Sequence, residues 1–231
     1  MGGRGAYSMS GRKRTGSMRN VGGAPDRRTD IQQMFKEIGF TDVTGTNGID
    51  AAVLGAYAIA LNRLEREYGA ISASDSPVFT TGNSTNTKAA VFYYEDRPSN
   101  QYMVISSDLM GTISTNVASQ RRAVQSGHHA ATDGKITSDA RYTITHEYGH
   151  MLSNALAARS GMNATAFSNR AASEIRSIAT SRYGAKRGSS VSDYGRTDSA
   201  EFFAESFASC LSGSPNAFGK AMRDWLKGNR L

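Results

Sequence analysis

The amino-acid sequence predicts an α+β domain in which a small mixed sheet lies over a central helix and the C-terminal half is mainly helical. The chain has 231 residues, of which 39% are hydrophobic, and this is enough to build one good-sized core. Apolar residues recur at helical spacing before and after one region of the chain. In that region, residues 76–107, the period changes to that of strands.

The formal charge of +7 is unevenly distributed along the chain. Residues 1–30 hold seven Lys and Arg against two Asp, whereas residues 31–231 hold twenty basic against eighteen acidic residues. Residues 1–28 are rich in Gly, Arg, Ser and Met and show no helical or strand period, so we expect a disordered basic tail. Nucleic acid or an acidic partner could bind this tail, although most such charge runs are simply solvated. Residues 29–231 then form the folded domain.

Cysteine content and hydropathy exclude some other classes of protein. Cys210 is the only cysteine, so no internal disulfide is possible and the fold needs no oxidising compartment. No run of about 18 apolar residues predicts a membrane helix, and the N-terminus lacks the apolar stretch of a secretory signal. We therefore expect neither a membrane partner nor export by the general route.

Two helices are expected before the sheet. Thr29 and Asp30 offer an N-cap for a short helix that ends at Gly39. Asp50 is expected to cap a longer helix whose apolar residues recur at helical spacing as far as Tyr68. We interpret this apolar stripe as core and not as a cofactor site.

The strand-like region contains three expected strands. They lie at residues 77–80, 88–94 and 101–106, and the loop 96–100 closes a hairpin between the second and the third. A helix from about residue 115 to residue 125 follows the sheet.

The adjacent residues His128 and His129 come directly after this helix. A second metal site is one interpretation, but neighbouring residues of a helix or an extended chain point in different directions. A pair in a surface loop is therefore the preferred interpretation.

The next helix carries the segment His146-Glu147-Tyr148-Gly149-His150, which is a His-Glu-x-x-His motif. Residues four apart lie on one helix face with β-carbons roughly 5–6 Å apart, so the imidazoles of His146 and His150 can bind one metal ion. Glu147 is turned away from both, which leaves its carboxylate free to accept a proton from a metal-bound water. Because the motif also arises by chance in large proteomes, its context decides between a metal site and an accident.

The helix around the motif is expected to begin with Ser138 or Asp139 as its cap and to run to about Arg159, with Gly161 ending it. Its faces separate the two histidines from the hydrophobic stripe, which favours metal ligands over core histidines. The hydrophobic stripe consists of Ile144, Tyr148, Leu152 and Ala155.

Residues 164–183 are expected to form a further helix, and the loop 184–192 leads to another helix that holds two carboxylates. By helical angle, Glu201 and Glu205 share one face of that helix. The side of this helix expected to face the core consists of Phe203, Phe207, Cys210 and Leu211. The thiol of Cys210 is then expected to behave as a small hydrophobic group.

Glu201 has two interpretations. Asp198-x-x-Glu201 matches a capping box, in which the glutamate bonds back to the helix start. A catalytic zinc, however, takes three protein ligands plus water, and two His with one Glu form such a set in metallopeptidases. On that interpretation Glu201 completes the set with His146 and His150, and Glu205 accepts the free N–H of a ligand histidine.

Together, the segments HEYGH and Y-G-x-x-D-x-x-E-F-F-A-E resemble the lethal-factor-like zinc metallopeptidase domain. This gluzincin-type domain also occurs in Pro-Pro endopeptidases and in proteins encoded by bacteriophages. The resemblance covers roughly residues 102–211 and is specific at residues 145–151 and 194–208. It implies a zincin-like metallopeptidase fold for the α+β domain.

The resemblance also implies roles for individual residues. It implies that His146, His150 and Glu201 bind Zn²⁺. Glu147 is then the general base. Tyr194, seven residues before the third ligand, would hydrogen-bond the oxyanion that develops during hydrolysis.

In that family a strand before the motif helix lines the cleft and pairs with an extended substrate, which implies this role for residues 102–106. The sequence departs from the family pattern at Asp198, where Asn is expected. Both residues cap helices, so the departure changes little.

The sequence therefore predicts a zinc-dependent endopeptidase that acts on a peptide or protein substrate. The alternative is a phage virion-associated structural or interaction protein with a metallopeptidase-like domain, and residues 1–28 are similar in composition to segments of phage structural proteins. Intact Glu147 and Tyr194 favour the enzyme, because a purely structural zinc site needs neither a base nor an open coordination position. Without a secretion signal, the expected location is the cytoplasm of a bacterial host cell or the virion.

Overall fold

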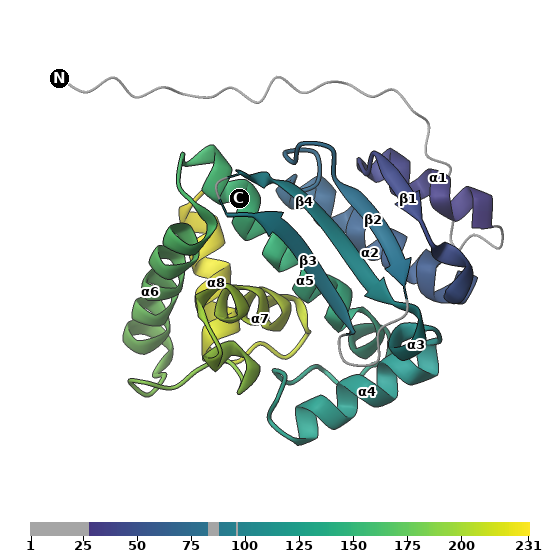
Figure 1. The fold of residues 1–231 in the computed structure, drawn as a ribbon. Helices are drawn as coiled ribbons and strands as arrows, with labels where there is room; N and C mark the ends of the chain where they lie inside the picture. The colour runs from purple at the N-terminus through teal and green to yellow at the C-terminus, as the bar shows by residue number, and fades with distance from the viewer. Residues whose placement is uncertain (1–27, 83–87, 96) are drawn as a thin grey trace.

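The computed structural model describes residues 28–82, 88–95 and 97–231 (Figure 1). The fold is mixed α/β, with a small mixed four-stranded sheet and helices that pack around it. The expected tail, residues 1–28, lies outside this part of the chain except for Arg28. In chain order, the helices and strands are α1 (Arg28–Ile38), β1 (Asp42–Thr44), α2 (Ala51–Tyr68), β2 (Val78–Gly82), β3 (Ala89–Tyr94), β4 (Arg97–Ser106), α3 (Ser107–Met110), α4 (Ile113–Gln125), α5 (Ile136–Arg159), α6 (Ala164–Tyr183), α7 (Ser199–Leu211) and α8 (Ala217–Gly228).

The two N-terminal helices lie close to the expected positions. α1 begins at Arg28, so Thr29 and Asp30 belong to its first turn, and their expected role as an N-cap is wrong. Gly39 follows the last residue of α1 with a φ of +132°, a conformation that side chains rarely adopt, and this confirms the expected stop. Asp50 occupies the N-cap position of α2, although its side chain makes no capping hydrogen bond.

The sheet has the strand order β1-β2-β4-β3. β4 pairs in parallel with β2 and antiparallel with β3, so the expected mixed sheet and the expected hairpin are both confirmed. The loop expected at residues 96–100 is shorter in the structure, because residues 97–100 belong to β4. Of the expected loop, residue 96 lies outside the described residues. β1 was not expected from the sequence, since three residues are too few to show a period.

β4 is an interior strand, and this corrects one expectation about substrate binding. Residues 102–106 are paired with β2 on one side and with β3 on the other, so their backbone groups have no free edge to offer to a peptide. Within the described part of the chain, β3 is the edge strand on this side of the sheet.

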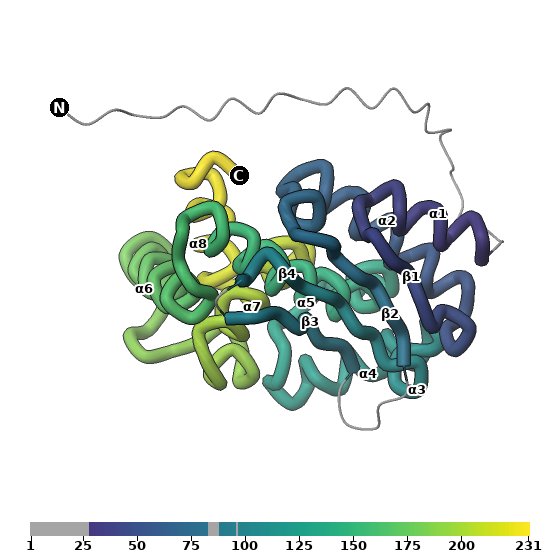
Figure 2. The backbone as a smooth tube through the Cα atoms, turned by 45° about the horizontal axis from the view of Figure 1, so that its top comes forward, coloured from purple at the N-terminus to yellow at the C-terminus, as the bar shows by residue number. Residues whose placement is uncertain are grey.

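One face of the sheet packs on helices, and the other carries exposed aromatic rings. α5 lies behind β3 and β4 in Figure 1, and Figure 2 shows the same arrangement after a 45° turn. Phe79, Met103 and Ile105 on the helix side are fully buried. On the opposite face Phe92 stacks on Tyr102, with ring centroids 5.3 Å apart.

α5 is the long helix expected around the His-Glu-x-x-His motif, but it begins earlier than expected. Its first residue is Ile136, with Lys135 at the N-cap position, so the caps expected at Ser138 and Asp139 are wrong. Asp139 is instead buried and accepts a hydrogen bond from Nε of Arg121 at 2.8 Å. The helix ends at Arg159, as expected. The residues expected on its core face, Ile144, Tyr148, Leu152 and Ala155, are all fully buried.

The C-terminal helices complete the core. α6 spans the expected residues, and α7 buries Cys210 as expected. Leu211, expected to face the core, is instead 37% exposed, because α7 ends at this residue. α8 was not expected from the sequence and packs Trp225 against Phe203, with ring centroids 5.6 Å apart. No helix within the described ranges is both long enough and apolar enough to cross a membrane.

Candidate metal centre

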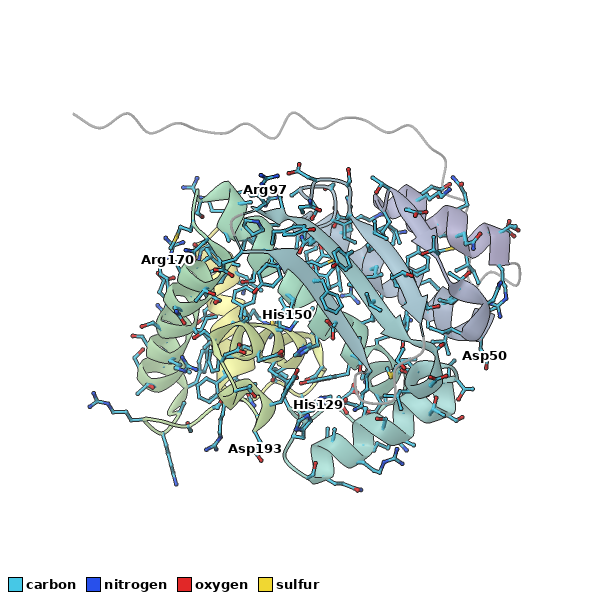
Figure 3. The ribbon with its side chains drawn as sticks, in the orientation of Figure 1. Asp50, Arg97, His129, His150, Arg170 and Asp193 are labelled. Carbon is cyan, nitrogen blue, oxygen red and sulfur yellow. The ribbon has the colours of Figure 1, made fainter. Side chains whose placement is uncertain are left out.

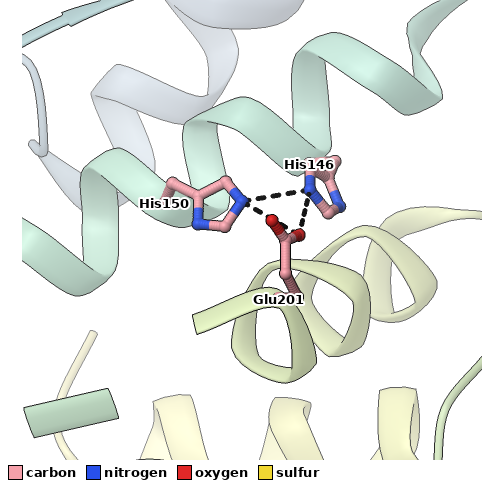
Figure 4. Close-up of side chains that lie close together, drawn as sticks. All are labelled: His146, His150 and Glu201. Carbon is pink, nitrogen blue, oxygen red and sulfur yellow. Dashed lines mark hydrogen bonds and ion pairs between the residues drawn. The ribbon is translucent and has the colours of Figure 1, made fainter. Parts of the chain in front are cut away.

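Three side chains from two helices converge on one point (Figure 4). His146 and His150 lie one turn apart on α5, and Glu201 lies in the first turn of α7. Oε2 of Glu201 is 3.0 Å from Nε2 of His146 and 3.3 Å from Nε2 of His150, and the two nitrogens are 3.1 Å apart. One potential ligand atom from each residue lies within 4.8 Å of the others.

The start of α7 explains how Glu201 reaches this point. Oδ1 of Asp198 accepts hydrogen bonds from the backbone N–H groups of Ala200 and Glu201, each at 2.8 Å. This N-cap supports the first turn of α7, in which Glu201 lies. The carboxylate of Glu201 faces the histidines and does not bond back to Asp198, so the reciprocal half of a capping box is absent from this described helix.

The chemistry of the three groups fits a bound metal ion. Oε2 of Glu201 is buried and has no hydrogen bond partner among the described residues, and its 3.0 Å approach to Nε2 of His146 is an ion-pair contact. A buried acceptor without a partner costs free energy, whereas a cation bound between it and two imidazole nitrogens would satisfy all three. Imidazole nitrogen with carboxylate oxygen is a ligand set that suits Zn²⁺.

Glu205 supports the first histidine from one turn further along α7. Its Oε1 lies 3.0 Å from Nδ1 of His146, and its Oε2 accepts hydrogen bonds from the Tyr142 hydroxyl at 2.9 Å and the Ala130 N–H at 3.2 Å. Burial opposes the charged carboxylate, but the hydrogen bond from His146 outweighs it and lowers the pKa of Glu205 to about 2. Glu205 is therefore a fully buried, ionised hydrogen bond acceptor for His146.

The same contacts act on the proton of His146. Burial alone would lower the pKa of His146, but its contacts with the carboxylates of Glu201 and Glu205 outweigh burial and raise the pKa well above the usual value. The two carboxylates therefore favour the imidazolium form of His146 when no metal is bound. For Glu201, burial again acts in the opposite direction, but the two histidines outweigh it and lower its pKa.

Glu147 lies on α5 beside the two histidines but outside the ligand set. Its side chain is buried, and no other described residue forms a hydrogen bond or ion pair with its carboxylate. Burial is the main cause that raises the pKa of Glu147, and the neighbouring histidines oppose the shift only in part. A carboxylate with a raised pKa and no competing partner is suited to accept a proton.

Tyr194 joins the cluster from the loop before α7, in the short 3-10 helix Tyr194–Arg196. Its hydroxyl donates to Oε1 of Glu201 at 3.0 Å, and its ring stacks on His146 with centroids 5.7 Å apart. The next residue, Gly195, is needed for space: a β-carbon there would lie 2.6 Å from a methyl carbon of Val191. The hydroxyl of Tyr194 is thus within hydrogen bond distance of the proposed third ligand.

The pair His128 and His129 divides between surface and interior. His128 is exposed, as expected, and its ring lies 4.9 Å from the ring of Tyr194. His129, which Figure 3 labels on the segment between α4 and α5, was expected in a surface loop but is mostly enclosed: it stacks on Tyr142 and its Nδ1 lies 2.7 Å from Oε1 of Gln120. Burial lowers the pKa of His129 to about 4. Neither residue belongs to the cluster of potential ligands.

Sequence reasoning missed Tyr93 of the edge strand β3. Burial raises its pKa, and the charges of Glu95, Asp198 and Glu201 add to the shift, so the ring lies within electrostatic range of the cluster. The alternation of a strand places every second side chain on one face, but it does not say which helix that face meets. Nothing in the sequence signals this neighbourhood.

Comparison with protein-family models, with curated proteins and with solved structures finds no match to this chain. The case for a function therefore depends on the residues themselves. His146 and His150 of α5 meet Glu201 of α7. Glu147 and Tyr194 lie beside these three residues, and Glu205 holds the imidazole of His146.

Proposed function

We propose that this protein is a zinc-dependent endopeptidase with a zincin-like catalytic domain. The observation that carries the proposal is the buried Oε2 of Glu201, which has no hydrogen bond partner in the described part of the chain and lies within 3.3 Å of the Nε2 atoms of His146 and His150. These three residues would hold the ion. When bound there, zinc would polarise a peptide carbonyl and lower the pKa of its bound water to about 7.

The protein's own groups would then perform the proton transfer and the positioning. Glu147 accepts a proton from the attacking water, because its raised pKa brings it closer to the neutral range in which a general base is most effective. Glu205 keeps the Nδ1 proton of His146 on the side away from Glu201. The hydroxyl of Tyr194, which donates to Glu201 in the structure, would be the donor to the developing oxyanion.

The edge strand β3 is the part of the sheet best suited to bind an extended substrate. Its outer backbone groups are not used by another strand within the described residues, and β3 packs against α5, which carries the motif. A peptide could add to such an edge through main-chain hydrogen bonds. This assigns to β3 the role that the sequence had assigned to residues 102–106.

The alternative, a virion-associated structural protein, finds less support in these contacts. A structural zinc site is closed by four protein ligands and needs no carboxylate beside it. Among the described residues the cluster offers three ligand residues, and Glu147 is buried without a hydrogen bond or ion-pair partner. Such burial costs stability, and a structural site gives no reason to keep it. The possible binding of nucleic acid or an acidic partner to residues 1–28 stays a prediction.

The test is to purify the full chain without chelator, measure its zinc content, and sequence the new termini that it creates in a proteome. We expect about one zinc per chain and cleavage of peptide bonds. His146→Ala, His150→Ala and Glu201→Ala should each lose most of the metal, whereas His128→Ala, beside the cluster but outside it, should keep the metal.

The Glu147→Gln variant separates metal binding from catalysis. It keeps the shape of the side chain but removes the proton acceptor, so zinc should stay while cleavage vanishes. Wild-type protein that binds no zinc would contradict the metal site. Cleavage by Glu147→Gln at the wild-type rate would contradict the general base.

A further inference from the structure

A pocket of about 460 Å³ lies between the start of β3 and one face of α4. Lys88, the residue before β3, contributes a cation from one side, and its carbonyl accepts a hydrogen bond from the Ser106 N–H at 2.8 Å. Arg122 and Ser119, three residues apart on α4, line the other side. The pocket thus has two cations, one from each of two elements.

These cations have no partner among the residues that the structure describes. Neither Lys88 nor Arg122 forms a hydrogen bond or ion pair with any described residue, and the hydroxyl of Ser119 has none either. Asp108 is the only acidic residue among those that line the pocket, and it is exposed. Burial lowers the pKa of Lys88, and the charge of Arg122 lowers it further. Two like charges around one hollow repel each other, and an anion between them would relieve that repulsion.

β3 links the pocket to the proposed catalytic centre, because Lys88 directly precedes this strand and β3 packs against α5, which carries the motif. The charge of Glu205, which bonds His146, acts on the pKa of Lys88, so the two groups are within electrostatic range. Lys88 also marks one end of the free edge of β3, and Tyr93, near the other end, is within range of Glu201. The five steps from Tyr93 to Lys88 span roughly 17 Å of strand, so a peptide on this edge would reach the pocket within about five residues of the scissile bond.

We propose that this pocket is a specificity subsite that binds a carboxylate of the substrate through Lys88, Arg122 and Ser119. The inference rests on the proposed peptidase function and names its substrate class: peptides with a carboxylate at a fixed distance from the cleaved bond. Arg can bind a carboxylate through two parallel hydrogen bonds, Lys adds a point charge, and the Ser hydroxyl adds a third kind of donor. The carboxylate belongs either to an Asp or Glu side chain or to the C-terminus of the peptide.

The experiment uses the zinc-loaded full chain and a pool of peptides from a digested proteome. We expect the cleaved peptides to be enriched in Asp and Glu at one position within about five residues of the cut, or to end at one fixed distance from it. Synthetic pairs then identify the source of the carboxylate. Replacement of the acidic residue by its amide, or amidation of the C-terminus, should lower kcat/KM by about 10-fold to 100-fold.

Arg122→Gln and Lys88→Gln should remove this preference while the cleavage rate of the amide peptides, the zinc content and the melting temperature stay unchanged. Arg187→Gln is the matched control, because Arg187 is an exposed cation on the loop after α6 and should leave the preference intact. Two outcomes would overturn the subsite and leave the peptidase function standing. One is cleavage by the wild type without any carboxylate preference, and the other is a preference that survives in the Arg122→Gln, Lys88→Gln double variant. Absence of cleavage by the zinc-loaded wild type would overturn the peptidase function and the subsite with it.

Discussion

Oε1 of Glu205 lies 3.0 Å from Nδ1 of His146, and this contact determines which nitrogen of the ring faces Glu201. Because the carboxylate accepts, Nδ1 carries a proton and Nε2 is the nitrogen left to bind a metal. Oε2 of Glu205 is held in turn by donors from Tyr142 and Ala130. The buried carboxylate therefore accepts from three donors, one at Oε1 and two at Oε2. A side chain with only one acceptor oxygen cannot replace both of these oxygens.

The variant Glu205→Gln tests this contact. One oxygen can still accept from His146, but the amide NH₂ then faces the N–H of Ala130, so two donors meet in the core. We expect zinc affinity to fall about 10-fold to 100-fold and the free energy of unfolding to fall by about 1–3 kcal/mol. Chelator competition and thermal unfolding measure the two effects. Glu37→Gln, on the exposed side of α1, is the control and should change neither. Unchanged zinc affinity in Glu205→Gln would remove Glu205 from the site.

Much of the candidate metal centre was predictable because it depends on local spacing. The four-residue separation of His146 and His150 places both on one helix face, and the same spacing holds for Glu201 and Glu205. Asp198 as the cap of α7 was equally local. Spacing could not predict that α5 and α7 meet. The prediction that Glu201 lies beside His146 and His150 came from the ligand chemistry of zinc and from the family resemblance.

The errors fall where a long-range contact decides the outcome. Residues 102–106 form a strand, as expected, but their place inside the sheet depends on pairing with β2, whose residues lie more than twenty positions earlier. The enclosure of His129 depends on stacking against Tyr142 and on Gln120 of α4. No period in the sequence carries such information, because strand order and loop packing are set by distant partners.

The proton on His146 predicts that zinc affinity depends on pH. The pKa of His146 is raised in the folded protein, so the imidazolium stabilises the metal-free fold. This contribution is fully present below the pKa of the unfolded state, about 6.5, and is lost as the pH rises through the pKa of the folded state. Zinc must displace that proton. We therefore expect binding near pH 7 to release roughly one proton from this histidine and zinc affinity to increase with pH.

Calorimetry in two buffers with different ionisation enthalpies measures the proton released at one pH. Chelator competition between pH 6 and pH 8 measures the change in affinity. The Glu205→Gln variant should release less, because a neutral amide holds the imidazolium less strongly. Binding without proton release in the wild type would show that His146 is already neutral.

Tyr194→Phe tests the role of one hydroxyl, on a peptide that the wild type cleaves. In the structure this hydroxyl donates to Glu201 at 3.0 Å, so two roles are open to it. If the hydroxyl donates to the oxyanion, its removal should lower kcat by about 10²–10³ while zinc affinity and KM stay unchanged. If the hydroxyl only positions Glu201, its removal should weaken zinc binding and leave kcat at saturating zinc near the wild-type value.

We expect the first of these results. Tyr183→Phe is the control, because that hydroxyl donates to Asp224 on α8 and has no contact with the metal cluster. Wild-type kcat and zinc affinity in Tyr194→Phe would leave Tyr194 only its ring stacking on His146.

Gly149, inside the His-Glu-x-x-His motif, determines how closely α5 and α7, the two helices that carry the candidate ligands, approach each other. A β-carbon at this position would lie 2.9 Å from Cα of Ala204, which belongs to α7 between Glu201 and Glu205. Backbone atoms cannot move aside as the end of a flexible side chain can, so Gly149→Ala must push α7 away from α5. Such overpacking costs about 1–3 kcal/mol of folding free energy, and it also moves Glu201 away from the two histidines.

We therefore expect Gly149→Ala to lower the melting temperature and to weaken zinc binding together, although no ligand has changed. Gly228→Ala is the matched control, since a β-carbon on that glycine at the end of α8 meets no atom within 4 Å. A third variant separates the two effects: Ala204→Gly in the Gly149→Ala background removes only the side-chain part of the clash, at 3.4 Å, and leaves the backbone part at 2.9 Å. It should restore little of the zinc affinity, because the close approach is between the new methyl group and the backbone of α7. Full zinc affinity in Gly149→Ala alone would mean that the spacing of α5 and α7 does not control the metal centre.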